Sequence, residues 1–108
     1  MKEIRAYIQP FVLGRLVQEL MEIPGFPGMT VVDCEGFGLT QVEAKQSFNP
    51  FLPKKRIEII ANDEQVEDIV AVIMQYAHTG RAGDGKVVVF DAQTMVHTRT
   101  GQSSDRLI

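Results

Sequence analysis

The segment from Thr79 to Lys86 combines three glycines with two cations and one carboxylate, in the order Thr-Gly-Arg-Ala-Gly-Asp-Gly-Lys. Glycines let backbone N–H groups converge on an anion, because no Cβ atom stands in the way. The ammonium group of Lys86 adds a positive charge that suits a phosphate group. These residue types predict a phosphate-binding loop. Composition alone leaves open the alternative, a glycine-rich connection that holds no ligand.

The same segment superficially matches the Gly-x-x-x-x-Gly-Lys pattern of a Walker phosphate loop. Val87, however, stands where such a loop carries Ser or Thr to hold magnesium. A Walker loop also leads from a strand into a helix, whereas this segment is expected to lead from a helix into a strand. The sequence therefore excludes a Walker-type nucleoside triphosphatase.

Few other residues have types that could do chemistry. Cys34 is the single cysteine, and its place on a predicted strand indicates a buried structural thiol. His78 is expected at a helix C-terminus, where a cation is favourable without any function. One cysteine and two distant histidines are a poor ligand set for soft metals, so no metal site is predicted. The basic run 54–56 indicates a solvated face rather than an anion site.

Hydropathy patterning predicts the elements that position the loop. Strands are predicted at 2–9, 29–35, 56–61 and 86–90, and amphipathic helices at 11–23 and from Asn62 or Asp63 to His78. Gly80 is expected to cap the second helix in a left-handed conformation. The order β-α-β-β-α-β indicates an α+β, ferredoxin-like sandwich. Segment 36–53 shows neither the alternation of a strand nor the three-to-four spacing of a helix, which predicts an exposed, mobile loop.

The predicted sheet has two helices for one face and needs cover on the other. Ile57, Ile59 and Ile60 put apolar side chains on both faces of the third strand, which indicates burial on both sides. The natural cover in a small domain is another copy of the chain. Met29 and Met74 are expected to fill the core.

The composition sets limits on the class of protein. A length of 108 residues predicts one domain over 1–108. The net charge of −3 means that the chain lacks the excess of positive charge typical of nucleic-acid-binding proteins, so nucleic acid is not expected as a partner. The longest apolar run, 69–74, is too short to cross a bilayer, and the first residues do not form a signal peptide. We therefore expect a cytoplasmic protein that is not inserted in a membrane.

The glycine loop resembles the B-loop of PII nitrogen-regulatory proteins, which usually reads Thr-Gly-x-x-Gly-Asp-Gly-Lys. Four other segments resemble motifs of the same family in the same order: Gly-Met-Thr-Val at 28–31, Gly-Phe-Gly at 36–38, Phe-Leu-Pro-Lys-x-Arg-Ile-Glu at 51–58 and Arg-Thr-Gly at 99–101. Together these motifs span nearly the whole chain. They make a far more specific match than one glycine pattern.

The resemblance implies a homotrimer that binds ATP or ADP in clefts between neighbouring subunits, where Lys86 and Arg99 bind phosphate. Its loops would be a T-loop at about 37–53, the B-loop at 79–86 and a C-loop at about 97–101. Nucleotide contacts would come, by motif, from Thr30, Gly38, Glu58, Ile60, Gly83, Asp84, Gly85, Lys86, His97 and Arg99. T-loop contacts to a protein target would come from Phe37, Thr40, Phe48, Phe51 and Lys54. The family lysine that Lys54 matches lies near the ligand cleft.

The chain also departs from the family pattern. His97 replaces the first of two C-loop arginines, and Leu39 and Thr40 replace an arginine and a glutamine that follow Gly-Phe-Gly. That arginine normally reaches the nucleotide phosphates, and the glutamine helps hold magnesium and 2-oxoglutarate. We therefore expect a weakened ATP–magnesium state and no assured response to 2-oxoglutarate. The loop is shorter than the family's and contains no tyrosine to modify, and Ser47 is its only hydroxyl besides Thr40.

The predicted function is signal transduction rather than catalysis. The shortened T-loop resembles PII-like branches associated with transporters, so the expected target is a membrane transporter or a metal-efflux system. A weak nucleotide hydrolase is the enzymatic alternative, although the sequence shows no nucleophile–base pair and no clustered carboxylates. A metal-binding trimer similar to the divalent-cation tolerance proteins is the third reading, and it leaves the glycine loop unexplained.

Overall fold

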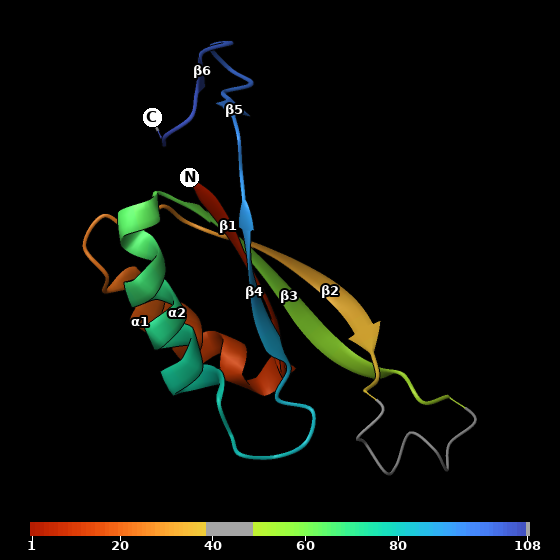
Figure 1. Ribbon diagram of the computed structural model, residues 1–108. Helices are drawn as coiled ribbons and strands as arrows, with labels where there is room; N and C mark the ends of the chain where they lie inside the picture. The colour runs from red at the N-terminus through yellow and green to blue at the C-terminus, as the bar shows by residue number, and fades with distance from the viewer. Residues whose placement is uncertain (39–48, 108) are drawn as a thin grey trace.

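A computed structural model describes residues 1–38 and 49–107, and its elements follow the predicted β-α-β-β-α-β order (Figure 1). The four long strands form one antiparallel sheet in the order β2-β3-β1-β4. Their bounds are β1 Lys2–Ile8, β2 Thr30–Gly36, β3 Leu52–Ala61 and β4 Lys86–Asp91. The helical segments are the 3-10 turn η1 Pro10–Val12, α1 Leu13–Met21 and α2 Asp63–Ala77. A short pair, β5 Met95–Val96 and β6 Ser103–Ser104, follows.

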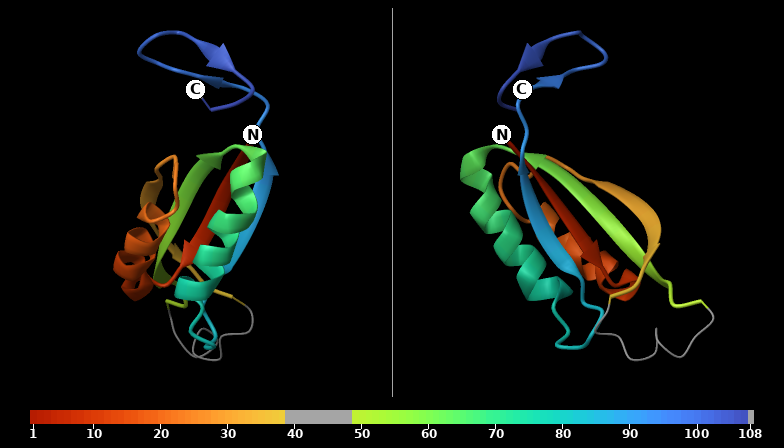
Figure 2. Two further views of the ribbon diagram at one scale, coloured as in Figure 1. Left: turned by 90° about the vertical axis from the view of Figure 1, so that its left-hand side faces the viewer. Right: turned by 45° about the vertical axis from the view of Figure 1, so that its right-hand side comes forward.

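Both helices lie on one face of the sheet, and the core fills the layer between them (Figure 2). Every second residue of β1 and of the end of β3 points into this layer, as a period of two requires. The fully buried side chains from the strands are Ile4, Ala6, Ile8, Ile57, Ile59 and Ala61, and those from the helices are Leu16, Leu20, Ile69 and Ile73. This arrangement confirms the predicted α+β class. The predicted trimer remains a prediction.

No described helix covers the second face of the sheet (Figure 2), and this face carries both charged and apolar side chains, since Glu3 pairs with Phe90 and Arg5 with Val88. On β3 this face carries Lys54, Arg56 and Glu58 before Ile60, because Ile57 and Ile59 both point toward the helices. The expectation of a third strand with apolar side chains on both faces therefore holds only at Ile60, because Ile57 and Ile59 share the helix-covered face and leave Arg56 and Glu58 on the other.

Ion pairs link the polar side chains across this second face. Arg5 Nη2 lies 2.7 Å from Glu3 Oε2 and 3.4 Å from Glu58 Oε2. The guanidinium of Arg5 also lies 5.0 Å from the centre of the Phe90 ring. The face thus holds a charge network that a single chain leaves partly exposed.

Strand β3 begins four residues earlier than the predicted strand at 56–61. Pro53, which was predicted to end the loop at 36–53, instead pairs with Glu35 of β2. The pairing with β1 stops at Lys55, so Pro53 has no neighbour on that side and its missing N–H breaks no bond there.

Helix α2 ends differently from the prediction. Its C-cap is His78, which is extended, and Gly80 lies two residues farther on with φ +83°. Gly80 therefore turns the loop and does not cap the helix. Met74 is 54% exposed and is not core filler, whereas Met29 packs against the core as predicted.

Residues 92–107 form the β5–β6 pair and a tail, which the sequence reading left as one turn and a polar end. The Gly101 N–H donates to the His97 carbonyl at 2.7 Å, and the His97 N–H donates to Gln102 at 2.8 Å. The tail then returns to the start of α2, where the Leu107 N–H donates to Asn62 Oδ1 at 2.9 Å. No helix among the described residues is long and apolar enough to cross a membrane.

Candidate functional site

The glycine loop is organised around the carboxylate of Asp84. This carboxylate accepts backbone N–H groups of Thr79 at 2.7 Å and Gly80 at 2.8 Å, and also the Thr79 hydroxyl. Gln9, at the end of β1, donates its side-chain amide at 2.9 Å. Burial by itself raises the pKa of Asp84, but the hydrogen bonds from Thr79, Gly80 and Gln9 outweigh it and hold the pKa well below its usual range. The carboxylate therefore stays ionised and shapes the loop.

Two further contacts fix the loop against the sheet. Gly85 has φ +95°, and a Cβ atom built on it would lie 1.7 Å from the Tyr7 carbonyl oxygen. Only glycine can approach β1 so closely. From β3, the Lys54 ammonium donates to the Gly83 carbonyl at 2.5 Å. The loop is thus held by β1 on one side and by β3 on the other.

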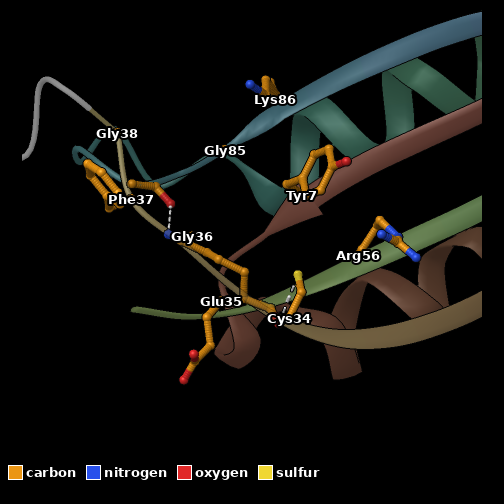
Figure 3. A pocket seen from close by; sticks show the side chains of 11 residues that line it. Tyr7, Cys34, Glu35, Gly36, Phe37, Gly38, Arg56, Gly85 and Lys86 are labelled. Carbon is orange, nitrogen blue, oxygen red and sulfur yellow. Dashed lines mark hydrogen bonds between the residues drawn. The ribbon is translucent and has the colours of Figure 1, made fainter. Parts of the chain in front are cut away.

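A pocket of about 570 Å³ opens between this loop and the end of β2, on the second face of the sheet (Figure 3). Its lining residues come from β1, β2, β3, the glycine loop and the start of β4. They are Tyr7, Cys34, Glu35, Gly36, Phe37, Gly38, Lys54, Arg56, Gly83, Gly85 and Lys86. Glycine backbone, aromatic rings and cations therefore meet in one cavity.

The charge in the pocket is positive. Three of its lining residues are cations, Lys54, Arg56 and Lys86, against the single acid Glu35. The Lys86 ammonium lies 6.0 Å from the centre of the Tyr7 ring and forms no ion pair with a described residue. Such a cavity can attract an anion and place an aromatic ring beside it.

The basic run 54–56 is divided by the alternation of strand β3. Lys54 and Arg56 face the pocket, while Lys55 points to the other face and lies 2.5 Å from Asp33. The predicted solvated face was therefore only partly right: all three side chains are half-buried, and Lys54 and Arg56 line the pocket. Lys54 was also grouped with the target-binding loop, but it lies in β3 and joins the pocket to the glycine loop.

Cys34 lies on β2 as predicted, but it is only half-buried and its side chain lines the pocket (Figure 3). Its Sγ lies 3.6 Å from the Lys54 carbonyl oxygen. The prediction of a buried thiol was wrong because Cys34 alternates onto the uncovered face. Among the described residues, no group of three or more His, Cys, Asp or Glu could hold a metal ion.

The structure brings together part of the predicted nucleotide site. Gly38, Gly83, Gly85 and Lys86 line the pocket, and Asp84 supports the loop from behind. Thr30, Glu58 and Ile60 lie farther along β2 and β3, where Thr30 pairs with Glu58. These three side chains share the face of the pocket but do not line it.

The turn between β5 and β6, which contains His97 and Arg99, lies at the opposite end of the sheet from the loop that precedes β4 (Figures 1 and 2). The six residues of β4 separate the two regions, which at about 3.3 Å per residue is roughly 20 Å. Within one chain, Arg99 and Lys86 therefore cannot bind the same phosphate groups. Thr40, Phe48 and Ser47 lie outside the described residues.

The two ends of the predicted T-loop meet through an aromatic pair. The rings of Phe37 and Phe51 lie 5.1 Å apart, with an interplanar angle of 87°. Both rings are about half exposed, and Phe37 also lines the pocket. This edge-to-face contact links the base of the loop to the cavity wall.

Sequence reasoning missed the pocket residues Tyr7, Cys34 and Arg56, as well as Gln9. Alternation along β1 and β3 could have placed Tyr7 and Arg56 on one face, since Tyr7 pairs with both Arg56 and Lys86. No local pattern indicates the bond from Gln9 to Asp84, because 75 residues separate them.

Comparison with known proteins identifies the family of the chain. The sequence profile of "Nitrogen regulatory protein P-II" matches residues 1–102. The chain is 37% identical to the nitrogen regulatory protein P-II of Pasteurella multocida, with both chains covered completely. It is 39% identical to the P-II protein of Klebsiella oxytoca and to P-II 1 of Escherichia coli K12, again over the full length of each. The chain therefore belongs to the nitrogen regulatory protein P-II family of signal-transduction regulators.

Proposed function

We propose that this protein is a homotrimeric, cytoplasmic signalling protein that binds ATP or ADP between subunits and regulates a protein target through its T-loop. The observation that carries the proposal is the glycine loop, which is held in shape beside a cationic pocket. Gly83 and Gly85 have positive φ angles of +93° and +95°, and the Lys86 ammonium has no acidic partner among the described residues. Such an arrangement suits phosphate groups.

The separation of the two cationic loops supports a site between subunits. Lys86 and Arg99 lie at opposite ends of β4, so one ligand can meet both only if a second copy supplies one of them. The second face of the sheet, which no described helix covers and which mixes charged with apolar side chains, offers the surface for that copy. In this arrangement the base would lie toward Thr30, Glu58 and Ile60.

The T-loop supplies the signalling step. Phe37 belongs both to the pocket wall and to the aromatic pair with Phe51, so a ligand in the pocket meets the base of the loop directly. A ligand shifts the balance between loop conformations only through its different affinity for them. A membrane transporter or a metal-efflux system is the proposed class of target.

Titration calorimetry with ATP and with ADP tests the nucleotide part of the proposal. We expect binding of both, together with a trimer mass by light scattering. Lys55→Ala is the matched control, because it removes a neighbouring cation that points away from the pocket. Absence of heat and of competition at millimolar nucleotide would contradict the proposal. Steady phosphate release well above that of Lys86→Ala would instead favour the hydrolase alternative.

A further inference from the structure

Arg56 is a cation of the pocket whose charge is poorly satisfied. Its Nε atom is buried and has no hydrogen-bond partner among residues 1–38 and 49–107. Arg56 forms a long ion pair with Glu58, 3.6 Å from Nε to Oε1 and beyond hydrogen-bond distance, and Arg5 pairs with the same carboxylate. The Arg56 side chain is 33% exposed, so the outer N–H groups of its guanidinium can bind an acceptor from outside the chain, although the buried Nε cannot.

The position of Arg56 along β3 indicates which part of a ligand it would meet. Lys54, Arg56, Glu58 and Ile60 alternate onto one face, at intervals of about 7 Å. Lys54 bonds to the glycine loop, where the terminal phosphates are proposed to bind. Glu58 and Ile60 are the proposed contacts of the base. Arg56 lies between these two ends, where a nucleotide carries its ribose and the first phosphate.

Across the sheet, Arg56 and Lys86 stand on either side of Tyr7 and pair with it from the two neighbouring strands. Figure 3 shows the Arg56 side chain on β3 and Lys86 on β4, with the Tyr7 ring between them. Leu39 leaves the chain without the arginine that follows Gly-Phe-Gly in the resembling family. A guanidinium from the sheet can supply the missing charge.

We infer that Arg56 is a second anion-binding residue of the cleft, which binds the phosphate group next to the ribose while the glycine loop and Lys86 bind the outer phosphates. The inference rests on the proposed nucleotide site. It adds Arg56 to that site and states which phosphate group each cation binds. A guanidinium suits this role because it offers several N–H donors in a fixed plane. Every ligand that carries this first phosphate should then depend on Arg56, whichever nucleotide is preferred.

The test compares Arg56→Met, Lys86→Ala and the control Lys55→Met by competition of ATP, ADP, AMP and adenosine against a fluorescent ADP analogue. Arg56→Met is expected to weaken ATP, ADP and AMP by a similar factor, about 10-fold to 100-fold, because all three carry the first phosphate. Adenosine should bind as before. Lys86→Ala should weaken ATP and ADP more than AMP, and Lys55→Met should change nothing.

Each outcome decides the inference. Unchanged ATP and ADP affinity in Arg56→Met overturns it and leaves the proposed function intact, whereas no binding by the unmodified protein overturns both. An equal loss in Lys55→Met also overturns it, because the effect would then be one of net charge. If Arg56→Met does not fold, Arg56→Lys decides: weaker binding of the phosphorylated ligands with adenosine unchanged supports the inference, and unchanged binding contradicts it.

Discussion

The glycine loop at 79–86 and the turn at 97–101 are both short, cationic and glycine-containing, but the chain holds them in different ways. The glycine loop is tied to its own sheet by Gln9, by Lys54 and by the close approach of Gly85 to β1. The turn at 97–101 is held by the two backbone bonds around His97, beyond the end of β4. Arg99 is exposed there.

The difference indicates which half of the proposed site each region forms. The glycine loop is complete within one chain, so its shape needs no partner. The turn at 97–101 presents a cation away from the body of its own domain, which suits a contribution to a neighbouring copy. Variants in the two regions should therefore differ in their effects on folding, on binding and on complementation.

Gly85→Ala should have the largest effect. The added Cβ would overlap the Tyr7 carbonyl, and φ +95° strains any residue with a side chain, so the loop must move. We expect nucleotide affinity to fall more than about 100-fold and the melting temperature to drop. Gly101→Ala is the matched control in the other region: its φ is also positive, at +73°, but no atom lies within 4 Å. Equal losses of stability in the two variants would contradict the close packing of the glycine loop.

Asp84→Asn should lower the free energy of unfolding by about 1–3 kcal/mol near neutral pH, because donors from Thr79, Gly80 and Gln9 lose a charged acceptor. The pKa of Asp84 is depressed in the folded state, so its contribution is complete above the ordinary value of about 3.9 and is lost as pH falls through the folded value. The gap in stability between the two proteins should therefore be constant from pH 7 to 5 and close only in stronger acid. Denaturant unfolding across this range measures it, and a gap that widens in acid would show that the carboxylate does not hold the loop.

Lys86→Ala should weaken ATP and ADP binding by about tenfold or more while leaving the melting temperature nearly unchanged. The reason is that, among residues 1–38 and 49–107, its ammonium forms no ion pair and lies 6.0 Å from the centre of the Tyr7 ring. Calorimetry of the variant beside the parent gives the ratio directly. Unchanged affinity would mean that the phosphates bind elsewhere.

Arg81→Ala should have the smallest effect. Arg81 belongs to the same loop, carries the same charge and is exposed like Lys86, but it does not line the pocket. We expect affinity within about twofold of the parent protein, because an exposed charge in salt solution is largely screened. A loss as large as that of Lys86→Ala would indicate that net charge, and not the position of Lys86, attracts the ligand.

Much of the fold was accessible from the sequence, since alternation in 2–9 and 86–90 and the apolar stripe of α2 are strong local signals. Strand β3 was placed too late because Pro53 is tolerated only where β1 has ended, which is a property of the sheet and not of the segment. The β5–β6 pair was missed because strands of two residues have no measurable period.

Only one part of the candidate site, the glycine loop, was predicted well from the sequence. The glycine loop is local, so its residue types alone indicated phosphate binding. Arg56 and Cys34 were misjudged because their role depends on which face they occupy, and that face is set by pairing with distant strands. The hydrogen bond from Gln9 to Asp84 joins residues that are 75 positions apart, and no sequence motif predicts it.

The central claim, that one nucleotide is bound by the glycine loop of one subunit and by Arg99 of another, can be tested by complementation. Lys86→Ala and Arg99→Ala proteins carrying different tags would be refolded together, and the doubly tagged oligomers isolated and titrated with ATP. We predict that mixed oligomers regain a fraction of sites with the affinity of the parent protein, because some clefts then combine an intact Lys86 with an intact Arg99. Mixed oligomers that bind no better than either variant alone would contradict a site shared between subunits.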